Sequence, residues 1–244
     1  MSATGEHEDG RTTGGGTLYI VATPIGNLED ISARAVRILD AVDLIAAEDT
    51  RTTRVLLHRF GISKPMVSYH GHNERSRTPG LIESLQSGRS IALVSDAGTP
   101  GISDPSCVVV REALKRGIPV VPVPGASAFL SALIASGLPT DRFVFEGFLP
   151  HKKGRKAKLQ SLRDEPLTII LYESPHRLRK TLDEILELLG DRQIVIAREL
   201  TKKFEEILRG RLSVVIHELR AVSPRGEYVI LVDGKKSISV NRSE

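Results

Sequence analysis

The feature that most constrains the fold is a repeated alternation between short apolar runs and amphipathic segments. The apolar runs are rich in β-branched residues, which is typical of strands buried on both faces of a parallel sheet covered by helices. In the first half of the chain the predicted strands cover residues 17–23, 43–48, 65–70, 90–96 and 118–125. The predicted helices cover residues 29–42, 50–60, 77–88, 105–117 and 126–137. The sequence therefore predicts a mostly parallel sheet in an α/β fold.

The second half keeps the apolar runs but loses the strict alternation. Two of its runs are joined only by the segment LTKK at 200–203, which is too short for a helical crossover, so these strands are expected to be antiparallel. The predicted strands cover residues 142–149, 167–173, 193–199, 204–210 and 227–234, and the predicted helices cover 176–190 and 211–219. A second α/β domain with a mixed sheet is expected.

This change of pattern predicts two folded domains. We expect an N-terminal α/β domain over residues 16–138 and a C-terminal α/β domain over 139–234. The polar segments 1–15 and 235–244 are expected to be disordered tails. The chain has no run of about 18 apolar residues, so no membrane partner is expected, and its first residues lack the apolar core of a secretory signal.

Composition limits the classes of function. Cys107 is the single cysteine, which excludes an intrachain disulfide and a cysteine-based zinc site and fits a reducing cytoplasm. The 34 Lys and Arg residues against 30 Asp and Glu give a net charge of +4. This balance permits an anionic partner such as RNA but does not establish one.

Polar or Gly- and Pro-rich segments follow the carboxyl ends of the predicted strands, where open α/β sheets bind their ligands. In chain order they read ATPIGN, AEDTRTT, YHGHNE, SDAGTPGISDP, VPGASA, YESPHR and ARELTKKFEE. The first of them lacks G-x-G-x-x-G, and no Walker P-loop is present, so a dinucleotide site is disfavoured. The alternative for SDAGTPGISDP is an ordinary strand-to-helix turn, and the alternative for AEDTRTT is a solvated helix start.

Each segment taken alone leaves two interpretations open. The turn before Ser127 could present free helix N–H groups to an anion, or Ser127 could be only a helix N-cap. His70, His72 and Glu74 could ligate a metal if the histidines shared one strand face, but no second cluster supplies further ligands, so no metal is expected. The basic segment at 150–158 could hold an RNA backbone or be a solvated surface.

In this order the seven segments resemble the tetrapyrrole methylase superfamily and, within it, the bacterial enzymes that methylate ribose 2′-oxygens of 16S ribosomal RNA. The resemblance covers residues 16–234. SDAGTPGISDP and AEDTRTT are specific to that branch, whereas the first strand, PGASA and GEYVI are shared by the wider superfamily. The resemblance implies a two-domain fold with S-adenosylmethionine in a cleft between the domains. It also implies a cytoplasmic homodimer that methylates a cytidine in the decoding region of 16S RNA, and not DNA.

The resemblance and the needs of the cofactor together indicate binding residues. Asp96 and carbonyls near Gly98 could offset the sulfonium charge, and N–H groups near Ser127 could hold the carboxylate. The expected cofactor residues are Pro24, Ile25, Asp96, Gly98, Thr99, Ile102, Gly125, Ala126, Ser127, Tyr172, Ala197, Arg198, Gly226 and Glu227. Among them, Ile25 and Ile102 are expected to line an apolar wall.

A ribose hydroxyl is a poor nucleophile, so a base that accepts its proton would help. The candidates, among which the sequence does not choose, are Glu48, Asp49, His70, His72, Glu199 and Lys202. Lys202 would need a depressed pKa. The expected RNA contacts are Arg51, Asn73, Lys152, Lys153, Arg155, Arg177 and Lys203, and the alternative for each basic residue is a surface charge.

Two rival functions stay open. A methyltransferase of the same superfamily could act on a small tetrapyrrole-like substrate, because a fold does not fix a substrate. Alternatively, the chain could be an RNA-binding module without catalysis. Salt-sensitive retention by RNA separates the first rival from the RNA enzyme, and cofactor binding separates the second.

Overall fold

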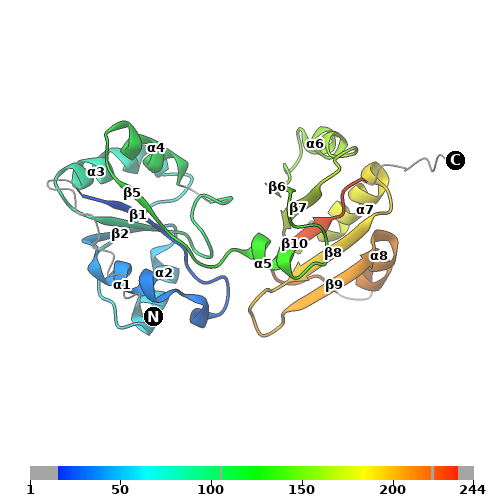
Figure 1. Cartoon of the computed structure of the whole chain (residues 1–244), viewed down its shortest axis with the longest axis horizontal. Coiled ribbons are helices and arrows are strands. Elements are labelled where there is room, and N and C mark those ends of the chain that lie inside the picture. The colour runs from blue at the N-terminus through cyan, green and yellow to red at the C-terminus, as the bar shows by residue number, and fades with distance from the viewer. Residues whose placement is uncertain (1–15, 105, 221–222, 236–244) are drawn as a thin grey trace, which may run out of the picture. The chain divides into compact units, whose positions relative to one another are not determined.

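The computed structural model describes residues 16–104, 106–220 and 223–235 (Figure 1). Their contacts form two compact units. Unit 1 contains the chain up to Thr23 and Ile31–Gly125, and unit 2 contains Pro24–Asp30 and the chain from Ala126 onward. The boundary expected at 138 therefore differs from the contact boundary at Gly125. The predicted tails, apart from Lys235, lie outside the described residues.

Unit 1 is built on a five-stranded sheet in the order β3-β2-β4-β1-β5, and every strand pair in it is parallel, which confirms the prediction. The strands are β1 (Leu18–Val21), β2 (Leu44–Ala47), β3 (Met66–Ser68), β4 (Ile91–Val94) and β5 (Val120–Val123). The helices are α1 (Ala33–Ala41), α2 (Thr50–Arg59), α3 (Glu74–Gln86) and α4 (Cys107–Lys115).

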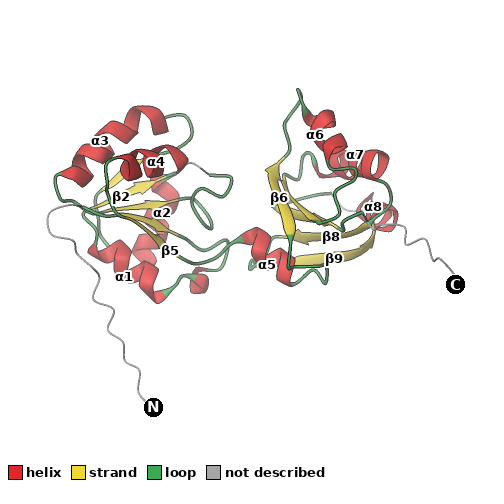
Figure 2. Ribbon diagram, turned by 45° about the horizontal axis from the view of Figure 1, so that its top comes forward, coloured by secondary structure: helices red, strands yellow, loops and turns green. Residues whose placement is uncertain are grey.

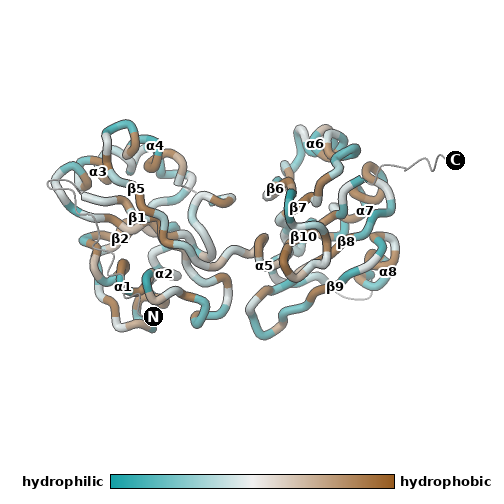
Figure 3. Tube along the Cα trace, viewed as in Figure 1, coloured by the Kyte–Doolittle hydropathy of each residue, from teal (hydrophilic) through white to brown (hydrophobic). Residues whose placement is uncertain are grey.

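Both faces of this sheet are covered (Figure 2). One apolar cluster joins α1 and α2 to the sheet, and a second joins α3 and α4 to the opposite face. All four residues of β4 are buried, as its uninterrupted apolar sequence predicts. Hydrophobic colouring follows strands such as β5 (Figure 3). Because helices cover both faces of the sheet, polar side chains gather at the ends of its strands.

Unit 2 is built on a second five-stranded sheet in the order β6-β7-β10-β8-β9. β6 and β7 are parallel and the other pairs are antiparallel, which confirms the predicted mixed sheet and the antiparallel pairing of β8 with β9. The strands are β6 (Phe143–Phe148), β7 (Thr168–Glu173), β8 (Gln193–Arg198), β9 (Glu206–Arg211) and β10 (Tyr228–Val232). The helices are α5 (Ala128–Ile134), α6 (Arg155–Ser161), α7 (Leu178–Leu189) and α8 (Leu212–Arg220), with a 3-10 turn η1 (Leu28–Asp30).

Successive residues of β7 point to opposite faces of this sheet. Ile169 and Leu171 enter the cluster under α6, α7 and α8, whereas Ile170 packs with Ala132 and Leu133 of α5. This packing explains why α5 belongs to unit 2. None of the helices within the described ranges is both long and apolar enough to cross a bilayer.

Two predicted boundaries shift. The basic segment at 150–158, expected as a turn, contains the start of α6, which packs Arg155 and Leu159 inward. α3 begins at Glu74 rather than at residue 77 and contains Pro79. A short helix with one buried leucine gives little periodic signal, so the sequence pattern does not reveal it.

Candidate functional site

The loop that follows β4 is fastened to the end of β1. Thr23 and Gly98 exchange two main-chain hydrogen bonds, with N···O distances of 2.8 and 3.0 Å. The Thr23 hydroxyl also donates to the Ser95 carbonyl at 3.2 Å. Gly98 has a φ of 81°, in the left-handed region that glycine adopts without strain. The glycine-rich sequence thus holds a fixed loop beside the strand ends.

Carboxylates gather where β2 and β4 end side by side. The Asp49 N–H donates to Asp96 Oδ1 at 3.0 Å, and the Asp96 N–H donates to Glu48 Oε2 at 3.2 Å. Adjacent parallel strands therefore bring Asp96 to the neighbouring pair Glu48 and Asp49, which lies almost 50 residues earlier in the sequence. All three residues follow predicted strands and were expected from the sequence as site residues.

A fourth acid, Asp104, belongs to this group, although it was not among the residues expected from the sequence. Burial, reinforced by the charges of Glu48 and Asp96, raises the pKa of Asp104 to about 6, despite a hydrogen bond from Ser95. Burial also raises the pKa of Asp96, and the charge of Asp49 adds to that effect. The signal that could have found Asp104 was its place in the quoted SDAGTPGISDP segment.

Asp49 has a different role from its neighbours. Its side chain caps α2 by accepting from the Arg51 N–H at 2.8 Å and pairs with the Arg51 guanidinium at 2.6 Å. These hydrogen bonds from Arg51 lower the pKa of Asp49 to about 2. A carboxylate so well satisfied is a weak proton acceptor, so the structure argues against Asp49 as the base.

The histidines lie in a turn rather than on a strand, because β3 ends at Ser68. Asn73 closes this turn: its Oδ1 accepts from the His70 N–H at 2.8 Å, and its Nδ2 donates to the Ser68 carbonyl at 3.2 Å. The rings of His70 and His72 meet edge to face, with their centroids 5.9 Å apart. The shared strand face considered for a metal is therefore wrong. Within the described ranges no three His, Cys, Asp or Glu side chains form a group suited to a metal ion.

Ser127 lies at the N-cap position of α5 but does not cap it. Its side chain makes no cap hydrogen bond, and its Oγ is buried without a partner. The simple N-cap interpretation therefore fails. An isolated hydroxyl in this position is a free hydrogen-bonding group next to the turn at Gly125, where a Cβ would approach the Ala22 Cβ to 2.9 Å.

Tyr172, at the end of β7, is held firmly within unit 2. Its hydroxyl accepts from the Phe129 N–H at 3.3 Å, and its ring packs against Phe145 and Phe148 at centroid distances of 5.2 and 5.5 Å.

Two other expected cofactor residues bury their side chains in the core of unit 2: Ile25 and Ala197 are 8% and 1% exposed. The burial of Ile25 in this core argues against its expected place in an apolar wall around the cofactor. Ile102 of unit 1 is half-buried.

Lys202 lies between two carboxylates. Its Nζ is 2.9 Å from Glu199 Oε1 and 2.8 Å from Glu227 Oε2. Burial alone would lower the pKa of Lys202, but the bonds to the two carboxylates outweigh it and raise the pKa. The depressed pKa that a lysine base requires is therefore absent, which argues against Lys202 as the base. Burial would likewise raise the pKa of Glu199, but Lys202 and the Glu227 N–H lower it overall.

The loop that carries Lys202 is strained and tightly packed. Glu199 and Thr201 have φ values of 49° and 66°, which are uncommon for residues with a side chain. A Cβ on Gly226 would come within 2.5 Å of the Glu199 carboxyl, and one on Gly26 within 2.4 Å of Lys202 Cγ. Gly26 and Asn27 therefore fit onto this loop within unit 2, with the Asn27 N–H donating to Thr201 Oγ1 at 3.1 Å.

The predicted RNA contacts divide by exposure. Lys152, Lys153 and Lys203 are exposed. Arg155 is 4% exposed, so the prediction that it contacts RNA directly is wrong. Arg177 is paired with the buried Glu173 at 2.8 Å. Arg198, expected at the cofactor, donates its Nε to the Arg225 carbonyl at 2.8 Å.

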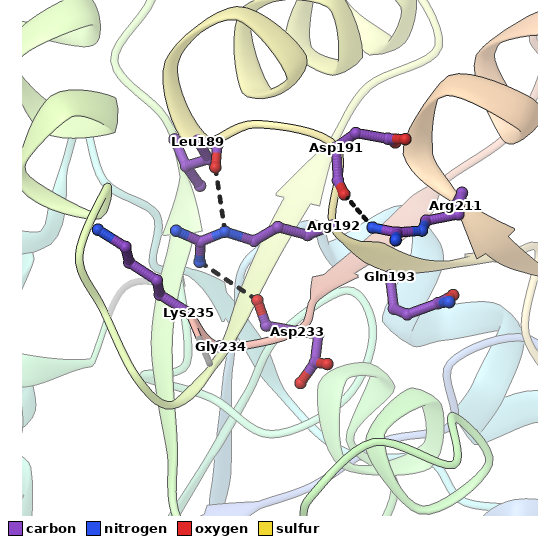
Figure 4. A pocket seen from close by; sticks show the side chains of 8 residues that line it. All are labelled: Leu189, Asp191, Arg192, Gln193, Arg211, Asp233, Gly234 and Lys235. Carbon is purple, nitrogen blue, oxygen red and sulfur yellow. Dashed lines mark hydrogen bonds between the residues drawn. The ribbon is translucent and has the colours of Figure 1, made fainter. Parts of the chain in front are cut away.

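A hollow of about 370 Å³ lies at the other end of the second sheet (Figure 4). The Arg192 guanidinium donates there to the carbonyls of Leu189 and Asp233, both at 3.2 Å, and Arg211 donates to the Asp191 carbonyl at 2.6 Å. Its lining contains none of the predicted site residues. Through these two bonds the Arg192 side chain ties the end of α7 to the residue that follows β10.

Comparison with known proteins places this geometry in context. Residues 17–215 match the family described as Tetrapyrrole (Corrin/Porphyrin) Methylases. A protein of Halalkalibacterium halodurans named ribosomal RNA small subunit methyltransferase I is 54% identical, over 90% of this chain and 76% of its own length. Proteins of the same name from Bacillus subtilis and Thermotoga maritima are 51% and 48% identical, over 94% and 91% of this chain and 79% and 100% of their own.

Solved structures show the same fold. A diphthine synthase has a TM-score of 0.71 at 17% identity, with 90% of each chain covered. The uroporphyrin-III C-methyltransferase of Thermus thermophilus complexed with S-adenyl homocysteine has a TM-score of 0.63 at 22% identity, over 90% of this chain and 98% of that one. At this level of identity the likeness concerns the fold alone.

Proposed function

The chain belongs to the tetrapyrrole methylase family, and on that premise we propose that it transfers a methyl group from S-adenosylmethionine to ribosomal RNA of the small subunit. The specific product we propose is the 2′-O-methylated ribose of a cytidine in the decoding region of 16S RNA. The observation that carries the proposal is 54% identity, over 90% of the chain, to a protein named ribosomal RNA small subunit methyltransferase I. We extend the proposal to a homodimer that acts in the cytoplasm.

The residues at the strand ends fit this cofactor. S-adenosylmethionine presents a carboxylate, a sulfonium and an adenosine, and when bound it supplies an electrophilic methyl group on a positively charged sulfur. The buried, unpartnered Ser127 Oγ can donate to a carboxylate. The Asp96 carboxylate, beside the fixed loop at Gly98, can offset a positive charge. Tyr172, held by Phe129, offers an aromatic edge to the adenosine.

We propose that Asp104 is the general base that accepts the proton of the ribose hydroxyl. The pairing of Asp49 with Arg51 and of Lys202 with two carboxylates makes both poor acceptors. Asp104 has a pKa of about 6, so it is ionised at pH 7 and a stronger base than an ordinary carboxylate. In this mechanism Glu48 acts through its charge, which helps to keep the pKa of Asp104 high.

The exposed basic residues bind the RNA in this proposal. Exposed Lys152, Lys153, Lys203 and Arg51 contact phosphates, which fix the RNA in register without reading its sequence. Much of the rate then comes from holding the 2′-oxygen in line with the methyl group.

The experiment that tests the proposal is methyl transfer from labelled S-adenosylmethionine to small ribosomal subunits that lack the modification, with the product nucleotide mapped. Label on a single ribose 2′-oxygen in the decoding region is the expected result. Tight cofactor binding without transfer to RNA would overturn the RNA substrate and favour a small tetrapyrrole-like acceptor.

A further inference from the structure

The basic segment 150–158 contains side chains in three different environments. Lys152 and Lys153 are exposed, and neither forms an ion pair with any residue that the structure describes. Lys156 pairs with Glu187 at 3.9 Å, and Lys158 pairs with Glu146 at 2.6 Å. Arg155 is buried. Only the tip of the segment therefore offers positive charges that other side chains of the described chain do not neutralise.

Arg155 ties this tip to the body of unit 2. Its Nε donates to Glu184 Oε2 at 2.7 Å and its Nη2 to Thr181 Oγ1 at 2.6 Å, both on α7. Its Nη1 donates back to the Pro150 carbonyl at 3.3 Å. One guanidinium thus joins the first residue of the loop to helix α7 and closes residues 150–155 into a compact turn.

A second guanidinium holds the preceding residue. Arg177 donates from Nη1 to the Leu149 carbonyl at 3.1 Å and pairs through Nη2 with Glu173 at 2.8 Å. Glu173 is 2% exposed, lies 3.7 Å from Arg155 Nη2, and accepts from the Thr181 hydroxyl at 2.6 Å. Two adjacent carbonyls of the loop stem are therefore fixed by two arginines that share one buried carboxylate.

A buried network of charges contributes little net free energy to the stability of a core. Apolar side chains of similar volume are often as stable as a buried ion pair, because desolvating charges is costly. What arginines add is directional bonds to several acceptors at once, which a leucine cannot supply. The arrangement therefore makes most sense as a device that fixes the position of the loop it holds.

We propose that Arg155, Arg177 and Glu173 are positioning residues that hold the loop at 150–154 so that Lys152 and Lys153 bind the phosphate backbone of the RNA substrate. The inference rests on the proposed function. A loop that is already ordered loses less entropy on binding, so two exposed lysines on a fixed backbone bind phosphates more tightly than the same lysines on a mobile one. Arg155 acts here through the loop and does not itself touch RNA.

A double-mutant cycle tests this inference, with KM for small subunits, kcat and the Kd of S-adenosylmethionine as readouts. Lys152→Gln with Lys153→Gln should raise KM about tenfold and reduce the slope of log K against log salt by about 2. Arg155→Lys keeps the charge but not the fork of bonds. It should raise KM about threefold to fivefold, with kcat and cofactor Kd unchanged, because it frees the loop.

The decisive result is the triple variant. If Arg155 acts through the two lysines, Arg155→Lys should add no further increase in KM once both lysines are glutamine. A full additional increase, or a weaker cofactor Kd, would overturn the inference and leave Arg155 as a structural residue. If Arg155→Lys does not fold, Glu184→Gln loosens the same guanidinium more gently and must show the same non-additivity.

Lys156→Gln is the matched control, because it removes an exposed charge from the same segment without touching the arginine network. Its effect on KM should be at most about twofold and should persist when both tip lysines are replaced. An effect as large as that of Arg155→Lys would show that net charge, not loop position, matters. Failure of the wild-type protein to methylate small subunits would overturn the proposed function, whereas wild-type transfer with an additive cycle would overturn this inference alone.

Discussion

Carboxylates at the strand ends of unit 1 and of unit 2 have opposite surroundings. In unit 1, Glu48, Asp96 and Asp104 face one another, and the pKa values of Asp96 and Asp104 are raised. In unit 2, Glu173 lies against two arginines and Glu199 against Lys202, and the pKa of Glu199 is lowered. Carboxylates surrounded by other acids suit the reactive role that we propose in unit 1, whereas carboxylates surrounded by cations hold the scaffold of unit 2.

The largest effect should come from removing the shared carboxylate of unit 2. Glu173→Ala leaves Arg155 and Arg177 without it, and losing one partner of a buried pair costs about 3–5 kcal/mol of unfolding free energy. Urea denaturation measures this loss. Glu187→Ala, at an exposed pair, is the control and should change stability by less than about 0.5 kcal/mol. A loss below about 1 kcal/mol for Glu173→Ala would remove the contrast between the two units.

Asp104→Asn tests the catalytic role that we propose for the carboxylates of unit 1. Loss of a proton acceptor should lower kcat about 100-fold or more, while cofactor Kd stays within a few-fold. In the wild-type protein kcat should rise as pH passes through about 6, and the variant should lack that rise. Asp183→Asn, on the exposed side of α7, is the matched control and should leave kcat unchanged. A decrease smaller than about threefold would exclude Asp104 as the base.

Asp96→Ala and Ser127→Trp test the cofactor contacts at the strand ends. Losing the charge that we propose to offset the sulfonium, or replacing the Ser127 hydroxyl by a bulky ring, should weaken S-adenosylmethionine binding about tenfold or more. Isothermal calorimetry measures the Kd, and Asp96→Asn separates charge from shape. Unchanged affinity in all three variants, with folding intact, would place the cofactor elsewhere.

The smallest expected effect concerns stability against pH. The folded-state pKa of Asp104 lies near 6, above the value of 3.8 for the free side chain, so ionising it opposes folding. That cost is complete above pH 6 and disappears as the pH falls towards 4. Asp104→Asn should therefore raise Tm by about 2–4 °C at pH 8 and not at pH 4, as thermal unfolding would show. An equal gain at both pH values would point to a cause other than ionisation.

The sequence predicted the features that depend on local pattern. Buried strands ending in polar loops led directly to Glu48, Asp96 and Ser127. Features that depend on distant neighbours escaped it. The pKa of Asp104 depends on burial and on the charge of Glu48, which follows β2 more than 50 residues earlier. Lys202 is held by Glu227, which lies 25 residues away, just before β10. Arg155 looked like one more surface cation because its partners on α7 lie 26 and 29 residues away.

Unit 2 is assembled from two stretches of chain that are made at different times. Ile25 belongs to the same buried cluster as Leu200, and the hydrogen bond from Asn27 to Thr201 spans 174 residues. At a synthesis rate of roughly 5–20 residues per second, the ribosome makes the second partner about 10–35 s after the first. During nascent-chain growth, the segment at 24–30 therefore waits without its native partners. A cut between residues 125 and 126 would likewise separate this segment from the unit to which it belongs.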